Sequence, residues 1–208
     1  MHPSASARHL ALAGLVGPVW FTALVILQGV LQPDYSHVAL PISALAAWPL
    51  GWVQILNFLV VGALMTAFGV AVHLGVRPSR GGVIGPALLV ANGIGIVIAG
   101  VFPWVMVDGV PTETPGHVVG AIVAFGSISL ALPLVSRRMR LDPSWRDVST
   151  YTMVTGIAVL LLFVAMGAFA IDDGTPLHPW AGLIQRILCA IWFTWMIVVA
   201  SRLRTQSR

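Results

Sequence analysis

The chain has 208 residues, of which 58% are hydrophobic and 9% are charged, and its formal net charge is +4. A soluble domain carries about 25% charged residues, so this composition excludes an ordinary soluble protein and also a disordered chain. Every basic residue is an arginine, and without lysine the chain has neither a Schiff-base amine nor a Walker A phosphate loop.

The apolar residues fall in long blocks, and a helix needs about 20 of them to cross the hydrocarbon core of a membrane. Six segments meet this requirement, and short polar or Pro/Gly-rich stretches separate them. We therefore predict an all-α bundle of six transmembrane helices that forms one integral membrane domain over residues 1–208. The predicted spans are about 10–31, 51–76, 83–102, 117–136, 150–171 and 181–201.

The first span is expected to be an uncleaved anchor, because its apolar run is too long for a signal peptide and no A-x-A cleavage signal follows. Ten of the basic residues fall on one side of the predicted bundle, and by the positive-inside rule this side, with both termini, is cytoplasmic. These residues are Arg8, Arg77, Arg80, Arg137, Arg138, Arg140, Arg146, Arg202, Arg204 and Arg208. We expect them to contact anionic lipid, and no nucleic acid.

The stretch 32–50 connects the first two spans on the predicted outer side and carries Asp34, His37 and Ser43. Its prolines alternate with apolar residues, which makes it too apolar for a free loop. It is expected either to lie in the membrane interface or to fold back over the bundle as a lid.

Polar residues within the spans also gather toward the outer side. Arg186 is the one basic residue that departs from the charge pattern, and it is expected either to bind an anionic group or a buried acid or to snorkel to the headgroups. Gln54 and Asn57 share a helix face and form interhelical hydrogen bonds or orient a ligand. Gln185 points about 100° away from Arg186. Together with His37, these residues are the candidate ligand-binding set.

Three chemistries fit the outer residues. A zinc site would draw on His37, His117 and His178, although no H-x-x-x-H or H-E-x-x-H spacing supports it. A hydrolytic triad would combine Ser43 and His117 with Asp172 or Asp173, although the chain has no G-x-S-x-G elbow. The third is an acid-initiated lipid cyclisation or isomerisation by the outer carboxylates, which would leave no sequence signature. The sequence requires no cofactor.

Four short stretches and one histidine carry a resemblance to a known family. They are YSHVALPIS at 35–43, GWVQILNF at 51–58, AGVFP at 99–103, GLIQR at 182–186, and His117 at the start of the fourth span. The chain thereby resembles the bacterial membrane family called domain of unknown function 998, over nearly its whole length.

The resemblance implies six spans in the bacterial cytoplasmic membrane but no settled activity. It points to Ser43, Gln54, Asn57, His117, Gln185 and Arg186. In the family an acidic residue often follows the serine, whereas Ala44 and Leu45 follow Ser43 here. This departure weakens any catalytic pairing between Ser43 and such an acid.

The leading hypothesis is a membrane protein with an outward-opening polar pocket under the first outer loop. The pocket would bind, and as a further step process, a lipid or isoprenoid-type amphiphile. Arg186 would hold an anionic group, Gln54 and Asn57 would orient it, and His117 with a nearby acid would move protons. The alternatives are a transporter or channel component, in which polar residues should follow the full depth of the path, and a scaffold without a ligand. The expected partners are membrane lipids, and the sequence gives no oligomeric state.

Overall fold

The computed structural model describes residues 4–76, 82–170 and 174–205. Within these residues, six helical segments are long and apolar enough to cross a membrane, and they correspond to the six predicted spans. The helices are α1 (Ala5–Ala11), α2 (Ala13–Val30), α3 (Gly51–Gly75), α4 (Ile84–Val101), α5 (Pro115–Arg140), α6 (Arg146–Phe169) and α7 (Ala181–Thr205). The first segment contains both α1 and α2. The predicted all-α, six-span architecture is therefore confirmed.

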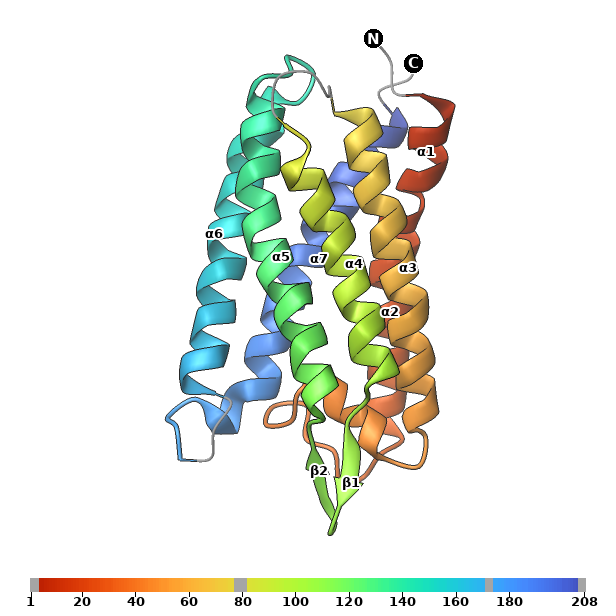
Figure 1. Ribbon diagram of the computed structural model, residues 1–208, viewed down its shortest axis with the longest axis vertical. Coiled ribbons are helices and arrows are strands. Elements are labelled where there is room, and N and C mark those ends of the chain that lie inside the picture. The colour runs from red at the N-terminus through yellow and green to blue at the C-terminus, as the bar shows by residue number, and fades with distance from the viewer. Residues whose placement is uncertain (1–3, 77–81, 171–173, 206–208) are drawn as a thin grey trace.

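The long helices run alternately up and down, so that all connections lie at two ends of the bundle (Figure 1). The end near the two chain termini is called the termini end. The opposite end, the hairpin end, carries two short 3₁₀ helices, η1 (Ile42–Ala47) and η2 (His178–Trp180), and the strands β1 (Val105–Val107) and β2 (Val110–Thr112). The cytoplasmic placement of the termini stays a prediction from the arginine distribution.

Glycines bring α4 and α5 into backbone contact. A Cβ atom added to Gly120 would come within 2.5 Å of the amide nitrogen of Ala99, and one added to Gly95 would come within 2.5 Å of the amide nitrogen of Ala124. Next to the second contact, Nδ2 of Asn92 donates to the carbonyl of Ala124 at 3.0 Å. Close approach of small residues is the usual way in which membrane helices gain packing contacts.

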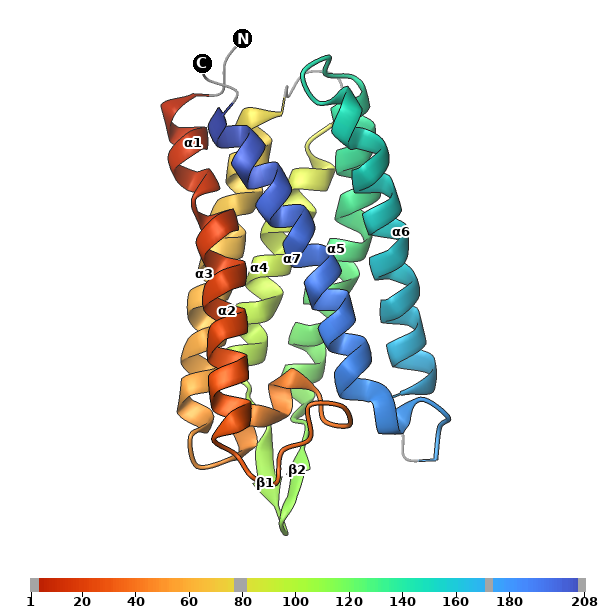
Figure 2. The ribbon, with the colours of Figure 1, turned by 180° about the vertical axis from the view of Figure 1, so that it is seen from behind.

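Helix α7 crosses the bundle diagonally, and α6 packs on it and on α5 (Figure 2). The buried residues of α6 lie between Val148 and Val159. No residue from 160 to 169 is buried. The segment 160–169 is therefore only partly covered, although Leu162 and Phe163 still pack against the core. Space remains between this segment, α5 and α7.

At the termini end, one of the predicted topology arginines is buried. Arg138 is 1% exposed and donates to the carbonyls of His73 at 2.8 Å, Val76 at 2.6 Å and Gly82 at 2.8 Å. Two of these carbonyls lie at the end of α3, where helical backbone acceptors have no partner within the helix. Arg138 therefore connects the end of α3 to Gly82, shortly before α4, and its positive charge also adds to the excess of arginine at the termini end.

The short hairpin β1–β2 is absent from the sequence-based expectation. Its turn residues, Asp108 and Gly109, have φ angles of 50° and 81°. Two successive positive φ angles are typical of a type I′ turn, which Asp-Gly favours strongly. That dipeptide between two short apolar stretches is the local signal for the hairpin, and both strands contact η1.

We expect Gly120→Ala to destabilise the protein, because its methyl group meets the backbone of α4. Overpacking of this kind costs about 1–3 kcal/mol. Gly126→Ala in the same helix is the matched control, because a Cβ there meets nothing within 4 Å. The control should leave stability unchanged or raise it by up to about 1 kcal/mol. Thermal unfolding in detergent checks both, and equal unfolding temperatures would contradict close α4–α5 packing.

Candidate functional site

The stretch 32–50 folds back over the hairpin end, which is the second of its two expected arrangements. Residues 42–46, most of η1, are buried. Nε2 of Gln28 donates to the carbonyls of Leu45 at 3.2 Å and Leu50 at 2.9 Å, and Oε1 of Gln185 accepts from the amide of Ile42 at 2.6 Å. These side chains supply partners that a buried, irregular backbone cannot find within itself.

Arg186 holds the preceding part of the same stretch. Its guanidinium donates to the carbonyl of Leu40 at 3.2 Å, to the hydroxyl of Tyr35 at 2.6 Å and to Nδ1 of His37 at 3.1 Å. It also donates to Gly182 within its own helix at 2.9 Å. Because arginine has no acceptor, Nδ1 of His37 must accept, and a neutral ring then carries its hydrogen on Nε2. We call this cluster the loop clamp.

The positive charge of Arg186 affects the pKa of its two aromatic partners, Tyr35 and His37. Burial and the positive charge of Arg186 both lower the pKa of His37. Burial raises the pKa of Tyr35, against the opposing effect of Arg186. Both residues are therefore held in the neutral form that the hydrogen bonds of the clamp require.

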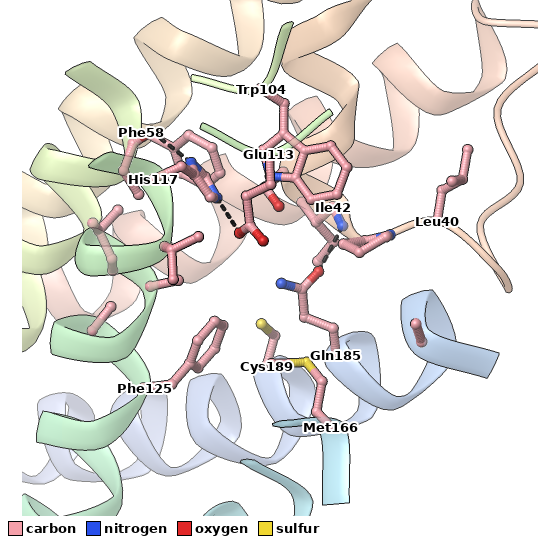
Figure 3. Close-up of a pocket in the computed structure, with 18 of the residues that line it drawn as sticks. Leu40, Ile42, Phe58, Trp104, Glu113, His117, Phe125, Met166, Gln185 and Cys189 are labelled. Atoms are coloured by element: carbon pink, nitrogen blue, oxygen red, sulfur yellow. Dashed lines mark hydrogen bonds and ion pairs between the residues drawn. The ribbon is translucent and has the colours of Figure 1, made fainter. Parts of the chain in front are cut away.

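A cavity of about 640 Å³ lies beneath η1 and the hairpin, within the range typical of small-molecule sites. Its walls come mainly from α3, α5, α6 and α7 and are largely apolar, as Phe125, Met166 and Cys189 illustrate (Figure 3). Glu113 and His117 face the interior from one side, and Gln185 does so from α7. The cavity thus combines an apolar body with a small polar group.

His117, which is 3% exposed, has a fixed orientation. Its Nδ1 lies 2.9 Å from the carbonyl of Ala99, an acceptor, so that Nδ1 carries the ring hydrogen and donates. Its Nε2 is then a proton acceptor and lies 3.9 Å from Oε1 of Glu113. That separation exceeds a hydrogen bond and leaves room for one oxygen atom within bonding reach of both groups.

Glu113 sits just before α5, next to the indole of Trp104 (Figure 3). Burial raises the pKa of this carboxyl above its usual range, and the neighbouring Trp104 offsets the shift in part. A carboxyl whose charged form is disfavoured, beside an imidazole nitrogen that accepts protons, forms a pair able to exchange a proton with a bound hydroxyl.

The structure brings some of the predicted site residues together and separates others. Four of the predicted site residues line the cavity, namely Ser43, His117, His178 and Gln185. His37 and Arg186 belong to the loop clamp, and Gln54 and Asn57 are fully buried in α3 outside the cavity wall. Asp172 and Asp173 lie outside the described residues.

The three histidines considered for zinc do not share one place, because His37 contacts Arg186 whereas His117 and His178 line the cavity. Within the part of the chain that the structure describes, no group of three or more His, Cys, Asp or Glu side chains is arranged to hold a metal ion. Asn57 donates at 3.4 Å to the carbonyl of Phe21 in α2, which is the expected interhelical hydrogen bonding, and at 3.4 Å to Oε1 of Gln54 within α3.

Sequence reasoning did not select Glu113 and Trp104 as site residues. Glu113 precedes His117 by four positions, and this spacing is the local signal that pairs them. Trp104 carries no comparable signal, because its place beside Glu113 depends on the hairpin that separates the two residues.

One family model matches residues 15–202, and its description reads "Protein of unknown function (DUF998)". The match covers most of the chain, so the protein belongs to this family. No curated protein and no solved structure matches the chain.

We expect acidification to loosen the loop clamp. Because the pKa of His37 is lowered in the folded protein, the unfolded chain binds the proton more readily, and folding stability at this site falls as pH drops through about 6.5. Amide hydrogen exchange of residues 35–47, corrected for intrinsic rates, should be several-fold faster near pH 5.5 than near pH 7.5.

His37→Gln is the control for this experiment, since a glutamine oxygen accepts from Arg186 at either pH. The variant should lose the pH dependence and keep the slow exchange. An unchanged pH dependence in the variant would contradict the assignment to His37.

Proposed function

We propose that this DUF998 protein binds a lipid or isoprenoid-type amphiphile in the cavity at its hairpin end. The observation that carries the proposal is the composition of the cavity wall, which is apolar over most of its surface and polar at Glu113, His117 and Gln185. An amphiphile matches this division, with its chain among the apolar residues and its polar end at the three polar side chains.

The cavity also has a lateral opening. Ile122 of α5 and Gly167 of α6 line it, yet both are exposed on the surface of the bundle. Residues that are exposed on both sides of a wall mark its mouth, and this mouth lies between two membrane-spanning helices. In a bilayer it faces hydrocarbon chains, which supports entry of the ligand from the membrane.

The core beyond the cavity favours binding over conduction. Phe68, Ile128, Leu132 and Trp195 are all at most 2% exposed and fill the bundle toward the termini end. A path for an ion or polar solute needs polar groups along its full depth. A transporter or channel function therefore has less support than a binding site that ends within the bundle.

Processing of the ligand is the finer part of the proposal. Nε2 of His117 would take a proton from the polar group of the ligand while Ala99 holds Nδ1, and the protonated carboxyl of Glu113 would give a proton back to the ligand. Loss of such an acid–base group typically lowers a rate by about 10²–10⁴. His117→Ala would then retain the bound amphiphile and lose its conversion. The arginine distribution predicts cytoplasmic termini in a bacterial cytoplasmic membrane. In that orientation the site would face the outside of the cell.

Native mass spectrometry of the detergent-purified protein tests the binding. The wild type should carry a co-purified lipid, and Ala121→Trp should reduce its occupancy at least about tenfold, because residue 121 lines the cavity and an indole there would project into the space that the lipid chain needs. Ala190→Trp on the exposed side of α7 is the matched control and should retain the lipid. A lipid-free wild type, or equal occupancy in both variants, would overturn the proposal.

A further inference from the structure

The charges around the cavity restrict the polar end of the ligand. The described residues of the cavity wall include no arginine, and their titratable side chains are Glu113, His117, His178 and Cys189, of which Glu113 is the one carboxyl group. Arg186 does not line the cavity. Its guanidinium donates to Leu40, Tyr35 and His37 in the loop clamp and to Gly182 in its own helix. A phosphate entering the cavity would therefore meet a carboxyl group and no arginine, although phosphates are typically bound by arginine or lysine.

Helix N-termini are the other common partners of phosphate. Two helices begin next to the cavity, α5 at Pro115 and α7 at Ala181. At α5, the amide of His117 is capped by the hydroxyl of Thr114 at 3.4 Å. At α7, the amide of Leu183 donates to the carbonyl of Val38 at 2.9 Å. These two backbone amides are engaged within the protein and are therefore not available to a phosphate.

The polar side chains offer a mixture of donors and acceptors. Nε2 of His117 accepts, and Glu113 contributes carboxyl oxygens 3.9 Å away. Gln185 has committed its oxygen to Ile42, so its amide nitrogen is the group directed into the cavity (Figure 3). The hydroxyl of Ser43, which both donates and accepts, lines the same space. An uncharged hydroxyl fits this set, since it donates to His117 or Glu113 and accepts from Gln185.

We propose that the cavity selects an uncharged amphiphile with one or more hydroxyl groups at its polar end, and that Glu113 excludes lipids with a phosphate there. This inference rests on the proposed function and deepens it by naming the ligand class. The proposed hydroxyl group takes the place of the anionic ligand group that Arg186 was expected to bind. The physical reason is that a phosphate stripped of water in this apolar cavity would find no arginine to pair with, and ionisation of Glu113 beside it would add repulsion in a medium of low dielectric constant.

Three probes with the same C18 monounsaturated chain test this selection by titration of the purified full-length protein, with native mass spectrometry as the readout. Monooleoylglycerol has an uncharged hydroxylated end, oleoyl lysophosphatidic acid adds a phosphate, and oleylamine carries a cation. The wild type should bind monooleoylglycerol at least about tenfold more tightly than oleoyl lysophosphatidic acid. Oleylamine, whose cation an ionised Glu113 would attract, tests whether the cavity also rejects a positive charge. Ala121→Trp should abolish this binding, which assigns it to the cavity.

The role of Glu113 is tested by Glu113→Gln, which keeps the side-chain shape and removes the charge. The preference for monooleoylglycerol over oleoyl lysophosphatidic acid should fall to less than about threefold. Asp108→Asn at the tip of the same hairpin is the matched control, because it removes one negative charge outside the cavity wall and should leave the preference unchanged. Thermal unfolding confirms that both variants fold.

The outcomes separate this inference from the function on which it rests. Equal or tighter cavity binding of the phosphate or the amine, sensitive to Ala121→Trp, would overturn the hydroxyl preference and leave the cavity as a lipid site. An unchanged preference in Glu113→Gln would overturn its excluding role. Failure of all three probes to bind, together with a lipid-free purified wild type, would overturn the proposed function itself.

Discussion

The cavity depends on how an irregular chain segment is held inside an apolar bundle. The stretch 32–50 lies over the hairpin end with most of η1 buried, where its backbone carbonyls and amides need partners other than water. Gln28, Gln185 and Arg186 supply them from two helices. With these bonds in place the segment forms the roof of the cavity, and without them the polar backbone would have to return to solvent and expose the apolar space beneath.

A second constraint is the unequal packing of the helices. Glycines allow α3, α4 and α5 to approach closely, so this side of the bundle has little space for anything but its own side chains. Helix α6 packs tightly only as far as Val159. The space available to a ligand therefore lies beside the part of α6 that follows Val159, where tight helix packing ends.

The six spans were predictable because the length of an apolar block is set by the thickness of a membrane. For example, the segment predicted at 51–76 is observed as Gly51–Gly75, the full extent of α3. The site was less predictable, since it depends on distant contacts. Arg186 looked like a ligand-binding residue because it breaks the charge pattern, but its partners Tyr35 and His37 lie about 150 positions away in the sequence. Likewise, the pair Glu113–His117 became recognisable only with the orientation of His117 against Ala99.

Gln185 and Arg186 are consecutive residues of one rigid helix, and both bind the roof of the cavity. The roof therefore cannot lift at Ile42 without straining the neighbouring attachment at Leu40, because α7 links the two anchors. The wall along α6 is less buried from residue 160 to Phe169, and its attachments are the stacking of Phe163 on Phe125 and the carbonyl of Phe169, which accepts from the amide of Leu177 at 2.9 Å. The residence time of a bound molecule would then be governed by the bending of α6 against the surrounding bilayer, and membrane thickness and fluidity would set the rate of exchange.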